Sequence, residues 1–189
     1  MEINYVGEHL FAGNLGYFFV VLAFGAAILS FLGYFLASKY KDDSWRKIGR
    51  IAFVAHGIGV FGTVITMAYL MSNHYYEFHY VWSHVSNDLP AAYMIPAFWE
   101  GQEGSFLLWT LWHVVLGFIL IKTAKTWESP GLMVVALAQL MLTAMLLGLD
   151  LWGDEAKELG MNPFRLLRTE MEAPIFNSPD YLKSIADGT

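Results

Sequence analysis

The chain has 189 residues, of which 56% are hydrophobic, 16% aromatic and only 15% charged, and its net charge is −6. An average soluble domain is about 25% charged, so this composition argues against a water-soluble globular protein. The acidic balance also argues against nucleic acid as a partner, because neutralising phosphates requires a basic surface. The absence of cysteine excludes disulfides, thiolate metal sites and a cysteine nucleophile.

Apolar residues gather in four windows that contain no Asp, Glu, Lys or Arg. Each window reaches or exceeds the roughly 18 residues that a helix needs to cross a bilayer. The windows cover residues 9–38, 51–76, 104–121 and 129–149. We therefore predict an all-α polytopic membrane protein. Its transmembrane helices are expected at about 15–37, 51–71, 105–121 and 131–151.

The chain is expected to divide into a membrane region, residues 1–152, and a tail, residues 153–189. Seven of the eleven basic residues lie in two short connections between the predicted helices: Lys39, Lys41, Arg46, Lys47, Arg50, Lys122 and Lys125. Positive residues are retained on the cytoplasmic side, so we expect both termini and the 72–103 loop on the opposite, outer side of the membrane. The loop is rich in aromatic residues, which indicates an ordered surface on the membrane face.

Two polar side chains fall in the middle of predicted spans. His113 lies halfway along the third window and Gln139 halfway along the fourth, and antiparallel pairing of these helices would let the two hydrogen-bond. Two interpretations stay open: a pair that only holds the helices together, or a ligand or proton-relay histidine, because ionisable residues inside membranes usually serve function. His56, six residues from the start of its window, is expected to be structural and to reach the interface.

Two further patterns resemble sites but are interpreted structurally. Residues 57–62 match the dinucleotide-binding pattern GxGxxG, yet they lie inside an apolar helix, where small residues serve close helix packing. His74, His79 and His84 recur every five residues, a spacing that turns successive side chains about 140° apart on a helix and to opposite faces on a strand. No metal site is therefore predicted.

The most distinctive local feature is the segment from Trp99 to Trp109, WEGQEGSFLLW. Ser105 is expected to cap a helix, and Glu103 suits the positive end of the helix dipole. Trp99 and Glu100 are not needed for this helix start. Their aromatic and carboxylate groups at a membrane surface are predicted to form the wall of a site for a flat amphipathic ligand.

This segment resembles the CcmF family, the large membrane subunit of the cytochrome c maturation haem lyase, which is grouped with CcsA among haem-handling membrane proteins. In that family Trp-Gly-Gly/Ala-Gln/His-Glu-Gly-Ser, followed by Leu-Leu-Trp, opens the third helix. Glu100 departs from the pattern, which has a small residue there. Supporting positions in the family's order are Ser86-Asn87, Leu89-Pro90, Tyr93, residues 162–167 and Asp187-Gly188.

The resemblance implies a function in cytochrome c-type biogenesis. Similar proteins receive haem from a haem chaperone and attach it covalently to apocytochrome c at the periplasmic face, together with other cytochrome c maturation subunits. The implied cofactor is a b-type haem whose ligands lie in later helices, so we expect this chain to be an N-terminal piece that is inactive alone. The residues expected to contribute are Trp82, Trp99 and Trp109 as a haem platform, Glu100, Gln102, Glu103 and Ser105 as the family motif, and His113 with Gln139 as the intramembrane pair.

Two other functions stay open on the sequence alone. A proton- or quinone-linked subunit of a respiratory complex would be built around His113, Gln139 and Asp150. A non-catalytic scaffold would use its helices only to hold another subunit in the membrane.

Overall fold

The computed structural model describes residues 5–150, 158–171 and 173–189. The regular elements of the described part are all helical apart from one short two-stranded ladder, in which Leu149 pairs with Leu159 and Asp150 with Glu158. In chain order the elements are α1 (Leu10–Tyr40), α2 (Asp43–Ser72), α3 (His79–His84), α4 (Ala91–Phe98), α5 (Gln102–Thr123), the 3-10 helix η1 (Lys125–Trp127), α6 (Glu128–Leu147), β1 (Leu149–Asp150), β2 (Glu158–Leu159), α7 (Leu167–Glu170), the 3-10 helix η3 (Pro174–Asn177) and α8 (Tyr181–Asp187).

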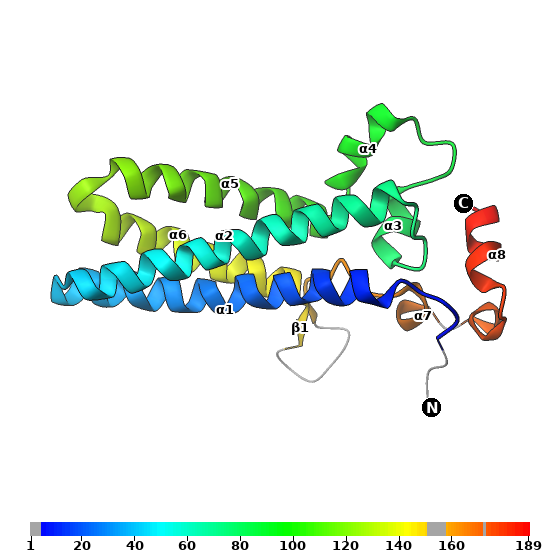
Figure 1. The fold of residues 1–189 in the computed structure, drawn as a ribbon, viewed down its shortest axis with the longest axis horizontal. Helices are drawn as coiled ribbons and strands as arrows, with labels where there is room; N and C mark the ends of the chain where they lie inside the picture. Colours follow the sequence, from blue (N-terminus) through cyan, green and yellow to red (C-terminus); the bar gives the residue numbers. More distant parts are fainter. Residues whose placement is uncertain (1–4, 151–157, 172) are drawn as a thin grey trace.

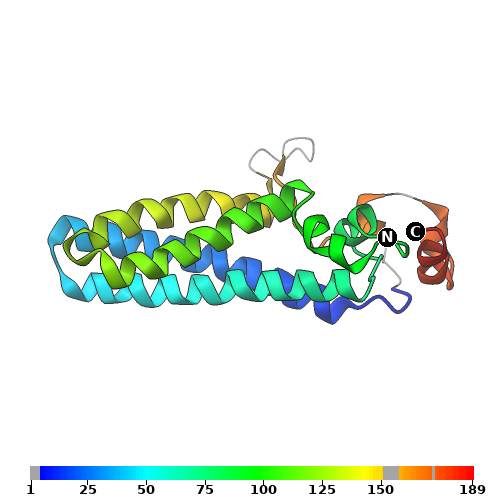
Figure 2. The same cartoon turned by 90° about the horizontal axis from the view of Figure 1, so that it is seen from above.

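Four of these helices are long and apolar enough to cross a membrane: α1, α2, α5, and α6 extended by η1, with mean hydropathy between 1.8 and 2.3. They lie side by side in an elongated bundle, and the short connections between α1 and α2 and between α5 and α6 lie at one end of it (Figures 1 and 2). The all-α polytopic membrane fold predicted from the four apolar windows is confirmed.

The helix ends differ from the predicted ones for local reasons. The second helix begins at Asp43 instead of 51, because the Asp42 side chain accepts a hydrogen bond from the backbone N–H of Ser44 and caps it. The fourth ends at Leu147 because Gly148 takes the left-handed conformation, with φ +67°; residue 151, its predicted end, lies outside the described residues. Hydropathy marks the part of a helix inside hydrocarbon, whereas backbone hydrogen bonding continues into the polar interface.

Small residues let the helices approach closely. A Cβ added at Gly59 would lie 2.7 Å from the backbone nitrogen of Ala23, and one at Gly33 would lie 2.7 Å from Gly49 Cα. Gly57 packs against the ring of Phe118 in the same way. The interpretation of the 57–62 glycines as packing residues is therefore confirmed, and α1 and α2 form a tight hairpin.

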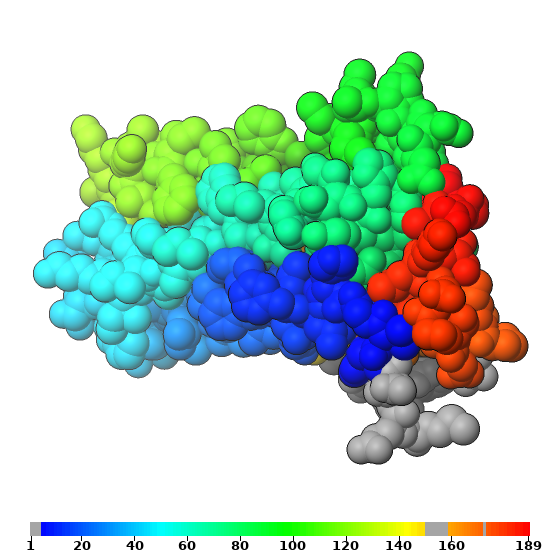
Figure 3. Space-filling model, turned by 45° about the vertical axis from the view of Figure 1, so that its right-hand side comes forward, coloured from blue at the N-terminus to red at the C-terminus, as the bar shows by residue number. Residues whose placement is uncertain are grey.

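The other end of the bundle carries an ordered cap made of the loop after α2 and the tail. Phe78 forms an isolated antiparallel bridge with Leu166, and Leu167 N–H donates to the carbonyl oxygen of Glu77 at 2.7 Å. The Arg168 guanidinium lies 2.7 Å from the Glu8 carboxylate, which joins the tail to the start of the chain. Figure 3 shows the tail, in orange and red, against the N-terminal segment in dark blue. The three segments predicted to share one side of the membrane thus lie at one end.

Candidate functional site

The Trp99–Ser105 segment forms a sharp corner between α4 and α5. Its helix begins at Gln102 and is capped by Gly101, three residues before the predicted start. Ser105 therefore does not cap the helix. Its backbone N–H donates to the Gly101 carbonyl at 3.0 Å, and its hydroxyl donates back to the Trp99 carbonyl at 3.0 Å. Ser105, in the first turn of α5, thus stabilises the corner between α4 and α5.

Tyr80 of α3 fills the inside of this corner. Its hydroxyl donates to the Phe98 carbonyl at 2.9 Å and accepts from the Gly101 N–H at 3.3 Å. The side chain is buried, and burial raises the pKa of Tyr80 to about 12. A Cβ at Gly104 would overlap both the Phe98 carbonyl oxygen and the Tyr80 hydroxyl. The second glycine of the motif is therefore required by the close approach of Tyr80.

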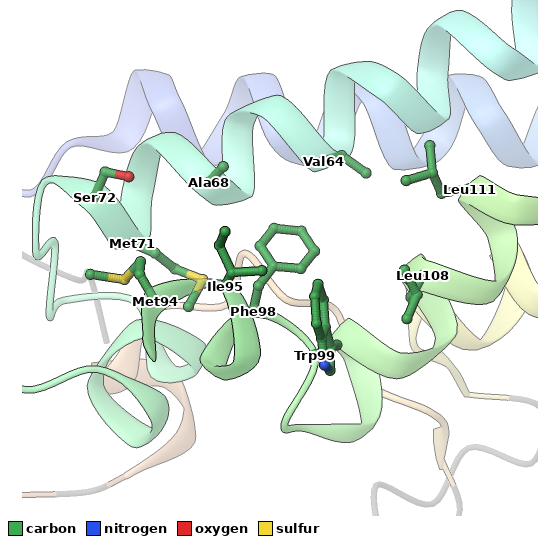
Figure 4. Close-up of a pocket in the computed structure, with 10 residues that line it drawn as sticks. All are labelled: Val64, Ala68, Met71, Ser72, Met94, Ile95, Phe98, Trp99, Leu108 and Leu111. Carbon is green, nitrogen blue, oxygen red and sulfur yellow. The ribbon is translucent and has the colours of Figure 1, made fainter. Parts of the chain in front are cut away.

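An apolar pocket of about 300 Å³ lies beside the corner, between α2, α4 and α5. Phe98 and Trp99 project into the space between the two longer helices (Figure 4). Ser72 is the one hydroxyl-bearing residue of its lining, which consists of Val64, Ala68, Met71, Ser72, Met94, Ile95, Phe98, Trp99, Leu108 and Leu111. The pocket fits the apolar part of an amphipathic molecule at the end of the membrane span.

The three tryptophans of the predicted platform lie in different surroundings. Trp99 lines the pocket, whereas Trp109 lies outside its lining and is 60% exposed on α5. Trp82 packs instead against the buried clusters that join the loop to the tail, next to Leu167 and Tyr181. The structure therefore brings only Trp99 to the pocket.

The polar motif residues surround the same corner. Glu100 and Gln102 are exposed, and Glu103 is half-buried in the first turn of α5. Glu100 and Glu103 place two carboxylates near the N-terminus of α5, where the helix dipole favours negative charge. Glu100 and Gln102 are thus the exposed polar side chains next to Trp99, which lines the pocket.

Inside the bundle, Gln139 does not form the expected pair with His113. Its Nε2 donates to the Thr110 carbonyl at 2.8 Å, and no hydrogen bond joins it to His113 within the described residues. The buried face of α5 passes through Thr110, Val114 and Gly117, and His113 lies at the flank of that face. Its Nδ1 is buried without a hydrogen-bond partner in the described part of the chain.

Gln139 lies beside His56 instead. His56 is fully buried, and its Nδ1 donates to the Ala23 carbonyl at 2.8 Å. Since α2 begins well before residue 51, His56 lies deep inside the helix and does not reach the interface as predicted. His56 thus connects α2 to α1 through Ala23, Gln139 connects α6 to α5 through Thr110, and the two side chains lie next to each other. The late start predicted for α2 concealed this role of His56.

A bundle of four membrane-crossing helices, with an ordered cap and an aromatic pocket at one end, defines an integral membrane protein with a site near the membrane surface. The chain is 26% identical over 134 residues to the cytochrome c-type biogenesis protein NrfE of Haemophilus influenzae, a match that covers 66% of this chain and 20% of NrfE. Among solved structures it is similar to the cytochrome c haem lyase CcmF, with a TM-score of 0.67 and 18% identity, over 77% of this chain and 25% of CcmF. No family model matches.

These two similarities confirm the resemblance to CcmF-type proteins that the Trp99–Trp109 segment indicated. They extend over a limited part of the relatives, since the chain spans about a fifth of the length of NrfE and a quarter of CcmF. The structural similarity shows the shared fold.

Proposed function

We propose that this chain acts in cytochrome c-type biogenesis, handling haem at the periplasmic face of a bacterial inner membrane. The observation that carries the proposal is the apolar pocket beside the Trp99–Ser105 corner, the same segment by which the sequence resembles haem lyases. The similarity to NrfE and the fold shared with CcmF support it.

In this proposal haem is the substrate, and the corner residues bind it in a fixed orientation. The indole of Trp99 and the lining of the pocket offer apolar contact to one edge of a flat porphyrin. Glu100 and Gln102 are exposed beside Trp99, so in this proposal the polar edge of the porphyrin stays in water. Apocytochrome c would approach the same face, where a haem chaperone and other maturation subunits deliver and use the substrate.

A resident b-type haem in the membrane does not fit the residues described here. Such a haem needs an axial ligand that opens into a cavity. His56 is enclosed between helices and hydrogen-bonded to Ala23. Neither His56 nor His113 lines the Trp99 pocket. The proposed function therefore requires no haem held within these four helices.

The respiratory alternative has less support from the described residues than haem handling. It required a relay of His113, Gln139 and Asp150, but Gln139 is bound to Thr110 and lies beside His56. The side chain of Asp150 lies outside the described part of the structure. Within residues 5–150, 158–171 and 173–189, no specific contact favours this function over haem handling.

The proposal is tested by replacing Trp99 in the complete gene product and measuring c-type cytochromes by haem staining of membrane proteins. We expect Trp99→Ala to lower the yield of haem-stained cytochrome c about tenfold, the equivalent of roughly 1.4 kcal/mol in binding. Trp109→Ala is the matched control, because this tryptophan is exposed and lies outside the pocket. Equal yields from both variants, with equal amounts of membrane protein, would contradict the proposed role of the pocket.

A further inference from the structure

A second arrangement at the capped end involves His9, which precedes the first turn of α1. Its ring nitrogen Nδ1 lies 2.6 Å from Glu77 Oε1, and its backbone N–H donates to the same oxygen at 3.1 Å. The imidazole stacks on Tyr75, with 3.7 Å between ring centroids and 8° between the planes. Three contacts from the loop after α2 thus fix the position and plane of one histidine.

Glu77 is itself held firmly. Its side chain is only 5% exposed, and its carbonyl oxygen accepts the Leu167 N–H from the tail. A buried carboxylate that accepts from Nδ1–H selects one tautomer of the imidazole, and the lone pair then resides on Nε2. The His9 side chain is 48% exposed. An outside ligand can therefore reach a histidine whose acceptor nitrogen is already defined.

An apolar groove of about 420 Å³ adjoins this histidine between α1 and α2. The Tyr69 and Tyr75 hydroxyls lie 3.3 Å apart at its edge. The groove uses Ile65 and Tyr69 of α2, whereas the Trp99 pocket uses Val64 and Ala68, so the two lie on different faces of that helix. Its lining consists of His9, Phe11, Ala12, Leu15, Ile65, Thr66, Tyr69 and Tyr75.

A single histidine such as His9 suits a metal whose equatorial positions are already occupied by a bound macrocycle. No cluster of three or more His, Cys, Asp or Glu that could hold a bare ion occurs among the described residues. A porphyrin iron needs only axial ligands from protein, and imidazoles backed by a carboxylate are common ones. The aromatic groove beside His9 supplies the apolar contact that the rest of a porphyrin requires.

We propose that His9 is an axial ligand, through Nε2, for substrate haem that enters the groove between α1 and α2, with Glu77 as the residue that positions it. The inference rests on the proposed function, because it identifies where the handled haem is held. It adds a site distinct from the Trp99 pocket. The two pockets on either side of α2 would then be two binding positions at one membrane surface.

The test uses the complete gene product in nanodiscs, titrated with haemin and followed by its Soret band and by electron paramagnetic resonance. We expect His9→Ala to weaken haemin binding at least tenfold and to change the spin-state signature. Glu77→Gln keeps the ligand but loses the carboxylate, so it should weaken binding about tenfold while the histidine-ligated spectrum is retained. His79→Ala is the control, since this histidine contacts Trp82 and lies outside the groove.

Chemical rescue separates ligation from misfolding. In His9→Gly, added imidazole should restore the wild-type spectrum if the lost group was an iron ligand. This inference alone would be overturned if His9→Ala bound haemin with the affinity and spectrum of the wild type. It would also be overturned if His9→Gly bound haemin weakly and added imidazole did not restore binding. If the wild-type protein binds no haemin and its Trp99→Ala variant matures cytochrome c normally, both this inference and the proposed function fail.

Discussion

One hydroxyl group organises the corner between α4 and α5. The Tyr80 hydroxyl contacts the Phe98 carbonyl and the Gly101 N–H, two backbone groups that lie on either side of the chain reversal. Buried backbone groups need such partners, and a tyrosine from another helix supplies them here. The shape of the Trp99 wall therefore depends on Tyr80 and on the glycine that makes room for it.

Gly104→Ala is expected to destabilise the protein by roughly 1–3 kcal/mol, because the new methyl group overpacks the site against Tyr80 and Phe98. Thermal unfolding in detergent would measure the loss. Gly25→Ala is the control, since nothing lies within 4 Å of a Cβ at that helical position. A Gly104→Ala protein as stable as Gly25→Ala would show that the corner does not require this close contact.

Tyr80 also predicts a pH dependence. Because burial raises the pKa of Tyr80 in the folded protein to about 12, its contribution to stability is complete below pH 10 and is lost as the pH rises towards 12. We expect the melting temperature to fall more steeply between pH 10 and 12 in the wild type than in Tyr80→Phe. Parallel curves for the two proteins would contradict the burial of this hydroxyl.

At this scale the sequence predicted the Trp99–Ser105 segment as a site but not its supporting residues. Tyr80, His56 and Glu77 gain their roles from partners far away in the chain. The loop after α2 contains several tyrosines and histidines of similar character, and no spacing rule shows which of them turns inward. Tertiary packing decides that, so sequence pattern alone could not.

At the scale of the helices, an ion pair with one buried partner joins three elements at the end with the short connections. Arg50 of α2 forms two hydrogen bonds of 2.5 Å to the Glu128 carboxylate at the start of α6. Tyr34 of α1 donates to the same carboxylate at 3.4 Å. Glu128 is 2% exposed, whereas the Arg50 side chain is 42% exposed. The two partners should therefore respond differently to substitution.

Arg50→Met is expected to cost roughly 3 kcal/mol, because it leaves the buried Glu128 carboxylate without its cation. Glu128→Gln should cost only about 1 kcal/mol, since Arg50 can turn towards water and the amide still accepts from Tyr34. Unfolding of both variants in the same detergent measures the difference. A larger loss for Glu128→Gln would contradict the burial of the carboxylate.

The number and order of the long helices could be predicted because uninterrupted apolar length is a strong and local signal. Their ends could not, since caps such as Asp42 and Gly148 act outside the hydrocarbon windows. The pairing of Gln139 was mispredicted for a related reason. A shared depth in the membrane does not determine which face of a helix a side chain occupies.

At the scale of the molecule, the bundle has two unlike ends. The short connections form the basic end, and α3, α4, α7 and α8 form the cap at the other end (Figure 1). The linings of the Trp99 pocket and the His9 groove include residues next to this cap, such as Trp99 and Tyr75. Between the two ends, α1 has 31 residues and is about 46 Å long, more than the roughly 30 Å of a hydrocarbon core. Its outer turns therefore reach the membrane surface, at the level of the groove.

The proposed orientation predicts opposite labelling at the two ends. These 189 residues contain no cysteine, so a single introduced cysteine is the one thiol in this segment that a maleimide can label. In intact spheroplasts we expect Glu100→Cys to react with a membrane-impermeant maleimide, and Lys41→Cys to react only after permeabilisation. Both positions are exposed. Reaction at Lys41→Cys in intact cells, with Glu100→Cys protected, would reverse the assignment of the capped end to the periplasm.

The contact between Glu8 and Arg168 constrains the order of assembly during synthesis. The first helix is synthesised long before Arg168, so the Glu8 carboxylate stays hydrated until the tail has been synthesised. The ion pair between Glu8 and Arg168 can therefore form only after the tail has been synthesised. The His9 groove does not depend on this step, because its lining comes from His9, α1, α2 and Tyr75, which all precede the tail in the chain.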